Sequence, residues 1–262
     1  MDKKIIFFDI DGTIITEDTN FIPSSTKNSI RQAQSNGHLT FINTGRPISE
    51  INSYLRELNF DGYVCGCGTY IEFKDEILLY KSLGNKLSKE IAEKLRKYNL
   101  DGILEGKESI YYDSVIHSDR VLNIKKLHIS ENFYHGATWD DPNINFDKFV
   151  LWINENSNFE GFYEEFKNIF EFIKRDSDFY EVVPLGFSKA SGIKFLLDKL
   201  SIPFENTYAI GDSTNDLSML KYVKNSIAMG NSNPILFDLV SFITKDINDD
   251  GIEHALKHYN II

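Results

Sequence analysis

Short apolar runs that end abruptly in polar residues recur along this chain. The first, residues 5–8, is β-branched and aromatic and is followed at once by Asp9 and Asp11. Similar runs cover residues 38–42 and 63–65, with helical spacing between them. Strands that alternate with helices in this way are typical of a parallel, doubly wound sheet. The pattern therefore predicts an α/β fold with a Rossmann-like sheet and a buried first strand.

The helices of this first part begin and end at recognisable residues. Residues 24–36 have helical spacing, and Gly37 closes the segment. Pro47 suits the first turn of another helix, which apolar residues at 51, 54, 55 and 58 continue at helical intervals. Each helix therefore joins two strands of the predicted sheet.

The alternation of short apolar strands and helices is interrupted at about residue 83 and resumes at Pro184-Leu185-Gly186. Between these points we expect a helix over 88–98, strands within 101–119, an irregular segment over 132–147, a strand over 149–153, a helix over 158–173 and a strand over 179–183. We therefore predict a core formed by residues 1–82 and 184–262, and an inserted α/β domain over 83–183.

The opening pattern recurs near the C-terminus. Residues 207–210 read as a short strand, which ends in Gly211-Asp212-Ser213-Thr214-Asn215-Asp216. Because the carboxyl ends of parallel strands share one edge of a sheet, Asp9, Asp11 and Asp212 can meet there. Lys189 opens the helix predicted over 188–200.

These strand-end residues have the composition of a phosphoryl-transfer site. Carboxylates hold a hard cation through oxygen, which favours Mg²⁺. A hydroxyl such as that of Thr44, backbone N–H groups and the Lys189 ammonium can neutralise phosphoryl oxygens. Each motif alone also has an ordinary interpretation, since Asp-x-Asp-Gly can be a solvated turn and lysine is usually a surface residue.

The composition and charge of the chain limit the classes of molecule that it is expected to bind. The chain has 262 residues, 42% of them hydrophobic, and a formal net charge of −11. This charge disfavours binding to nucleic acid or to an anionic membrane, but it allows a small phosphorylated ligand. Two cysteines, Cys65 and Cys67, are too close together for a structural disulfide. With neither a signal peptide nor a run of transmembrane length, we expect a cytoplasmic protein; its oligomeric state is not predicted.

The motifs together resemble those of the haloacid dehalogenase (HAD) superfamily. Asp9-Ile10-Asp11-Gly12-Thr13 is similar to its first motif, Thr44-Gly45 to the second, Lys189 to the third and residues 211–216 to the fourth. Asn43-Thr44-Gly45-Arg46, residues 181–189, Ala228-Met229-Gly230-Asn231 and Asp249-Asp250-Gly251-Ile252 resemble the Cof-type phosphatases. In those enzymes an α/β cap of the C2B type, which determines substrate specificity, is inserted where residues 83–183 lie here.

The resemblance implies a role for each matched residue. Asp9 is the nucleophile that forms an aspartyl-phosphate. Asp11 is the general acid and base, and its backbone carbonyl is a Mg²⁺ ligand. Asp9 and Asp212 complete the metal ligands, and Asp216 supports them. The resemblance implies that phosphate is bound by Thr44, Gly45, Lys189 and Asn215. Arg46 is a candidate for contact with substrate.

The function that these expectations support is a Mg²⁺-dependent phosphatase of small phosphorylated metabolites, such as sugar phosphates. A phosphosugar mutase and a phospho-accepting signalling or binding protein share part of the pattern, although a signalling receiver is a compact single domain. One departure concerns Cys67-Gly68, where the family usually has Asn-Gly. That asparagine often lies near the rim of the site, so the change bears on substrate positioning more than on chemistry.

Overall fold

The structure is a computed structural model that describes residues 2–16 and 18–262. The chain forms two compact units. The first comprises Met1–Gly45, Ser53–Leu78 and Ser188–Ile262, and the second comprises Arg46–Asn52 and Leu79–Phe187. Residues 46–52, which were expected in the core, group with the second unit in the structure.

The first unit is built on an eight-stranded sheet. Its strand order is β13 (Phe242–Ile243), β12 (Asn225–Ala228), β11 (Thr207–Gly211), β1 (Ile5–Phe8), β2 (Leu39–Asn43), β3 (Gly62–Cys65), β4 (Tyr70–Phe73) and β5 (Glu76–Tyr80). The strands from β13 to β3 run parallel, and β4 is antiparallel to β3. Phe8 of β1 is in register with Ile210 and Ile42, so the residues that follow these strands emerge at one edge of the sheet.

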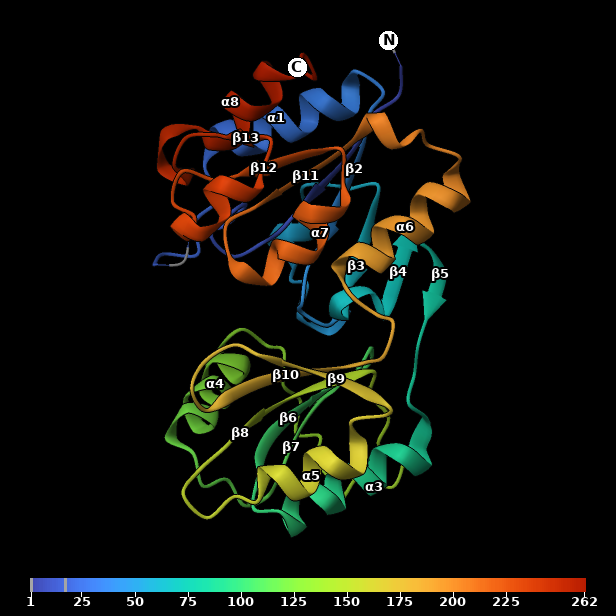
Figure 1. Ribbon diagram of the computed structural model, residues 1–262, viewed down its shortest axis with the longest axis vertical. Helices are drawn as coiled ribbons and strands as arrows, with labels where there is room; N and C mark the ends of the chain where they lie inside the picture. Colours follow the sequence, from blue (N-terminus) through green and yellow to red (C-terminus); the bar gives the residue numbers. More distant parts are fainter. Residues whose placement is uncertain (1, 17) are drawn as a thin grey trace. The chain divides into compact units, whose positions relative to one another are not determined.

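Helices cover both faces of this sheet (Figure 1). They are α1 (Ser24–Ser35) and α8 (Gly251–His258), which pack together, α6 (Lys189–Leu200) and α7 (Leu217–Tyr222), which also pack together, and the short α2 (Ser53–Arg56). Short 3₁₀-helices are η1 (Ile48–Glu50), η2 (Gly66–Gly68), η3 (Phe204–Asn206), η4 (Thr214–Asp216), η5 (Pro234–Leu239) and η6 (Ile247–Asp249). All four side chains of β1 are fully buried between these layers, which confirms the predicted α/β class.

The second unit contains a five-stranded antiparallel sheet. Its order is β7 (Ile110–Tyr112), β6 (Asp101–Glu105), β8 (Lys148–Trp152), β10 (Phe179–Pro184) and β9 (Phe170–Lys174). Its helices are α3 (Gly84–Lys97), α4 (Asp119–Ser130) and α5 (Phe159–Phe166). Alternate residues of β8 belong to separate apolar clusters, with Phe149 and Leu151 packed against α3 and α5, and Val150 packed against α4.

Two local predictions in the chain were wrong, and two elements were missed. The helix expected over 158–173 ends at Phe166, and β9 follows it, because Phe170 and Phe172 alternate with polar residues at the period of a strand. The segment after Pro47 forms only η1 and α2 and not one continuous helix. Neither the β4–β5 hairpin nor α4 was predicted. No helix in residues 2–16 or 18–262 is long and apolar enough to cross a membrane.

A buried charge cluster lies on the sheet of the second unit. Lys148 Nζ is 2.6 Å from Glu105 Oε2 and 2.9 Å from Glu181 Oε1, and Arg175 binds the other oxygen of Glu181. Burial is the largest influence on Glu105 and raises its pKa to about 8, although Lys148 opposes the shift. Burial would also raise the pKa of Glu181, but Lys148 and Arg175 outweigh it and lower that pKa.

This cluster predicts a pH-dependent stability. Folded Glu105 keeps its proton between its ordinary pKa of 4.5 and about 8, whereas the unfolded carboxyl has lost it. The free energy of unfolding contributed by this group therefore falls as pH rises through that window. Replacing Glu105 with Gln should stabilise the protein increasingly with pH, by at least about 1 kcal/mol near pH 9.

Urea unfolding of the wild type and Glu105→Gln, between about pH 5 and about pH 9, measures this difference. Glu108→Gln is the matched control, since Glu108 is exposed. It should track the wild type at every pH. Parallel pH profiles for the wild type and Glu105→Gln would contradict the prediction.

Candidate active site

The loop after β1 lies directly against the acid that follows β11. The Thr13 hydroxyl donates to Asp212 Oδ1 over 3.1 Å in a fully buried hydrogen bond. A methyl group on Gly12 would lie 2.4 Å from Asp212 Oδ2, and Gly12 has a φ of +73°. Both the close approach and the left-handed backbone require glycine at this position. The structure thus joins residues from opposite ends of the chain.

Three carboxylates and one ammonium group form the centre of this edge. Asp9, Asp212 and Asp216 are buried, and one ligand oxygen of each lies within 4.8 Å of those of the others. Lys189 Nζ is 2.7 Å from Asp9 Oδ1 and 2.6 Å from Asp216 Oδ1. The ammonium therefore bridges two acids that would otherwise repel one another in a buried setting.

Asp216 is held by its surroundings through both oxygens. Oδ1 accepts from Lys189, while Oδ2 accepts the backbone N–H groups of Asp212 and Ser213 at 3.0 and 3.1 Å. A side chain so engaged orients the Asp212 backbone. These bonds connect the Asp216 side chain to the loop that carries Asp212.

Burial also influences the pKa values of Asp9 and Lys189. It is the largest influence on Asp9 and raises the pKa of that carboxyl, and repulsion from Asp216 and Asp11 acts in the same direction. Lys189 opposes both effects. Burial alone would lower the pKa of Lys189, but Asp216 and Asp9 outweigh it and raise that pKa, so Lys189 is charged at neutral pH.

Thr44 and Gly45 follow β2, the neighbour of β1, at the same edge. The backbone of Thr44 is fixed on both sides, since its N–H donates to Val64 over 2.9 Å and its carbonyl accepts from Cys67 over 3.1 Å. Cys67 has a φ of +55°, in the left-handed region where asparagine is enriched. Asparagine, which is usual at this position in the family that the motifs resemble, therefore adopts this backbone more readily than cysteine does.

The remaining predicted site residues, Asp11, Asn215 and Arg46, lie in different parts of the chain. Asp11, half-buried, follows Asp9 in the loop, and Asn215 lies in η4, where its Oδ1 accepts from the Ser213 hydroxyl over 2.8 Å. Arg46 belongs to the second unit.

Sequence reasoning gave no role to three side chains that support this edge. The Asn43 amide donates to the carbonyl of Lys189 over 3.1 Å and so holds the first residue of α6. Asn231 donates to the carbonyl of Gly12 over 2.8 Å. Thr13 donates to Asp212. All three lie within the motifs quoted above, but only the folded chain pairs them with their partners.

The donor set fits a hard divalent cation. Asp9 uses Oδ1 for Lys189. Asp212 uses Oδ1 for Thr13. Buried carboxylate oxygens of this kind suit Mg²⁺, which binds oxygen ligands, and disfavour metals that prefer thiolate or imidazole.

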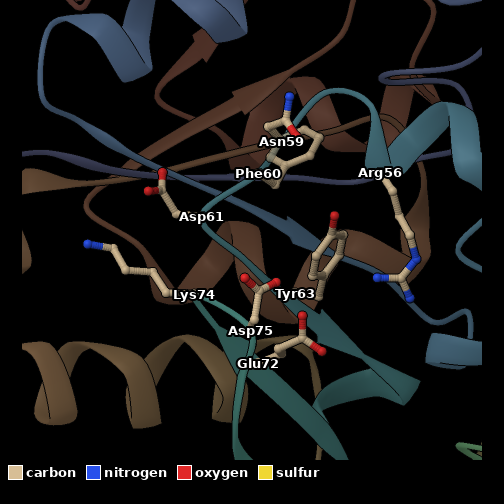
Figure 2. A pocket seen from close by; sticks show the side chains of 8 residues that line it. All are labelled: Arg56, Asn59, Phe60, Asp61, Tyr63, Glu72, Lys74 and Asp75. Carbon is tan, nitrogen blue, oxygen red and sulfur yellow. The ribbon is translucent and has the colours of Figure 1, made fainter.

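A pocket of about 410 Å³ lies elsewhere in the first unit (Figure 2). Its lining includes Asp61, Tyr63 and Glu72, close to the amino end of β3, which is the edge of the sheet opposite Asp9. Asp61 accepts from the backbone and hydroxyl of Thr40, and Glu72 accepts from the Tyr70 hydroxyl. This pocket is therefore separate from the acidic group.

Known proteins resemble the chain along its whole length. A family model for haloacid dehalogenase-like hydrolases matches residues 6–256. The putative phosphatase YkrA of Bacillus subtilis (strain 168) is 31% identical over 271 residues, which cover 100% of both chains. A hypothetical protein from Geobacillus kaustophilus HTA426 has a TM-score of 0.84 and 26% identity, covering 99% of this chain and 100% of that one. The HAD subclass IIB sugar phosphatase BT4131 has a TM-score of 0.81 and 28% identity, with the same coverage.

Proposed function

Because the chain belongs to the haloacid dehalogenase-like hydrolase family, we propose that it is a Mg²⁺-dependent phosphatase of small phosphorylated metabolites. The observation that carries this proposal is the buried group in which Lys189 bridges Asp9 and Asp216 beside Asp212. It combines a nucleophile, a cation for phosphoryl oxygens and oxygen ligands for a metal.

Asp9 is the nucleophile of the proposed reaction. An Asp9 carboxylate oxygen forms a bond to phosphorus as the bond between phosphorus and the ester oxygen breaks, which leaves an aspartyl-phosphate. The Lys189 contact holds Asp9 in one orientation and favours its ionised form. The nucleophile is thus positioned before substrate arrives, as efficient transfer requires.

Asp11 moves the protons. It donates one to the leaving alkoxide in the first step and accepts one from water in the second, so that phosphate is released and both acids return to their starting states. Asp11 is half-buried, which suits a group that must reach both substrate and water.

Phosphate oxygens would be held by Thr44, the Gly45 N–H, Lys189 and Asn215. Thr44 is almost fully buried with its backbone fixed, which supports a preorganised donor, and Lys189 carries a full charge in a dry setting. Such donors stabilise the negative charge of the transferring group without reorganising.

Asp9, the backbone carbonyl of Asp11 and Asp212 would hold Mg²⁺. When bound, the ion neutralises charge on the phosphoryl oxygens. Asp216 would orient Asp212 and not bind the ion itself, because both of its oxygens already accept hydrogen bonds.

The second unit would act as the cap that selects the substrate, and Arg46 is a candidate contact. Sugar phosphates are the proposed substrate class, since BT4131 is described as a sugar phosphatase. Purified protein assayed against a panel of phosphometabolites, with and without Mg²⁺, tests the function. We expect phosphate release that requires the metal. Transfer between sugars without phosphate release would contradict a phosphatase and favour a mutase.

A further inference from the structure

Lys189 reaches the acidic group from the first turn of α6. Its ammonium lies 2.7 Å from Asp9 and 2.6 Å from Asp216, and the side chain is 2% exposed. A buried lysine held between two carboxylates at these distances has little freedom of its own. The point at which the ammonium can meet a phosphoryl group is therefore set by where the helix begins.

A side chain from β2 holds the beginning of this helix. Asn43, the last residue of β2, donates from Nδ2 to the backbone carbonyl of Lys189 over 3.1 Å. Both residues are buried, and they are 146 residues apart in the chain. Because Thr44 follows Asn43 directly, this hydrogen bond joins the strand end that carries Thr44 to the residue that carries the ammonium.

The oxygen of the same amide makes no hydrogen bond. Asn43 Oδ1 is buried, and none of residues 2–16 and 18–262 donates to it. An unpaired buried acceptor costs stability, which offsets what the Nδ2 bond contributes. The amide therefore adds little net stability, and its main effect is to fix the direction in which α6 starts.

Two glycine contacts show how closely the start of α6 fits against β3 and η2. A methyl group on Gly192 would lie 2.4 Å from Val64 Cγ1, and one on Gly68 would lie 2.5 Å from the carbonyl oxygen of Ser188. These contacts restrict the helix by shape. The Asn43 bond adds a directional contact to them.

We propose that Asn43 is a positioning residue, which places the Lys189 ammonium against the phosphoryl group by holding the first residue of α6. The inference rests on the proposed function, because it assumes that Lys189 binds phosphate. Without the Nδ2 bond, the first turn of α6 can shift relative to Thr44, so that the two side chains no longer fit one phosphoryl group together. Preorganised donors lose much of their value when they are displaced by about 1 Å.

Two substitutions remove this hydrogen bond and suit the strand. Asn43→Val removes both polar atoms of the amide and places a β-branched side chain in a buried strand. Asn43→Thr is closer to asparagine in volume, and its hydroxyl is one bond nearer the backbone than Nδ2, too short to reach the carbonyl of Lys189. This second variant decides the question if Asn43→Val does not fold.

Asn225→Val is the matched control. Asn225 begins β12, and its side-chain amide donates to the carbonyls of Glu205 and Thr207, each over 3.0 Å. The control therefore loses hydrogen bonds of the same kind at the amino end of a parallel strand, away from the edge that carries Asp9. Calorimetry measures the affinity for inorganic phosphate with Mg²⁺ present, thermal unfolding measures stability, and turnover gives KM and kcat.

We expect both Asn43 variants to weaken phosphate binding and to raise KM by roughly tenfold. Asn43→Val should melt no lower than the wild type, because the unpaired Oδ1 is removed together with the bond. Asn225→Val should melt lower and bind phosphate like the wild type. A merely structural role for Asn43 would not separate stability from phosphate affinity in this way.

The proposal is overturned if both Asn43 variants bind phosphate like the wild type, or if Asn225→Val weakens binding equally. Failure of both Asn43 variants to fold would also overturn it, because the amide would then serve the fold itself. A wild type that binds phosphate but hydrolyses no ester contradicts the phosphatase assignment alone, since the calorimetric comparison still decides the role of Asn43. A wild type that binds no phosphate contradicts both.

Discussion

Asp9→Asn should reduce phosphate release by at least about a thousandfold while the protein remains folded. Asparagine has nearly the same shape as aspartate, but its amide cannot attack phosphorus to give the acyl phosphate. Lys189 keeps Asp216 as a partner at 2.6 Å, so the ammonium is not left unpaired. The loss is therefore one of chemistry, and steady-state turnover on the best substrate measures it.

The same substitution should leave the melting temperature unchanged or raise it. Burial and repulsion from Asp216 raise the pKa of Asp9, which means that its ionised form costs stability in the fold. Asp75→Asn is the matched control, since Asp75 is exposed and lines the separate pocket of Figure 2. It should retain full activity. Turnover by Asp9→Asn close to that of the wild type would refute the assigned nucleophile.

Lys189→Met should destabilise the protein by about 3–5 kcal/mol when divalent cations are absent. The side chain is 2% exposed, and its removal leaves Asp9 and Asp216 buried without their shared counter-charge. Methionine fills a similar volume, so the loss is mainly electrostatic. Urea unfolding measures the change in free energy.

Two further variants separate this effect from the loss of any lysine. Lys194→Met changes an exposed residue on the same helix and should alter stability by less than about 0.5 kcal/mol. Adding Asp9→Asn to Lys189→Met removes one of the two stranded charges, so the double variant should be more stable than Lys189→Met alone. Equal stabilities for the single and double variants would show that Asp9 and Lys189 are not energetically coupled.

The parallel core of the first unit was predictable from sequence because its strands are apolar and end in polar motifs. Residues 5–8 are buried on both faces of the sheet, and a run of this kind has few alternatives. The antiparallel sheet of the second unit was harder to predict. There, Phe170 and Phe172 alternate with polar residues next to a helix of similar composition, and the boundary between the two periods is weak.

The candidate site was likewise predictable only in part. Parallel register requires residues after β1, β2 and β11 to share an edge, so the grouping of Asp9 with Asp212 follows from topology. The hydrogen bonds that hold the surrounding loops do not follow from topology. Asn43 and Asn231 bond to backbone carbonyls far away in sequence, and such pairings depend on loop conformation. The packing of residues 46–52 in the second unit likewise leaves no periodic signal.

Acid quenching during turnover, followed by mass spectrometry of the peptide that contains Asp9, is the most direct test of the proposed mechanism. The account predicts a phosphoryl group on the Asp9 carboxylate, formed only with substrate and Mg²⁺ and absent from Asp9→Asn. Phosphate release by the wild type with the phosphoryl group on a different side chain, or with no phosphoryl group on Asp9 at any stage of turnover, would contradict it.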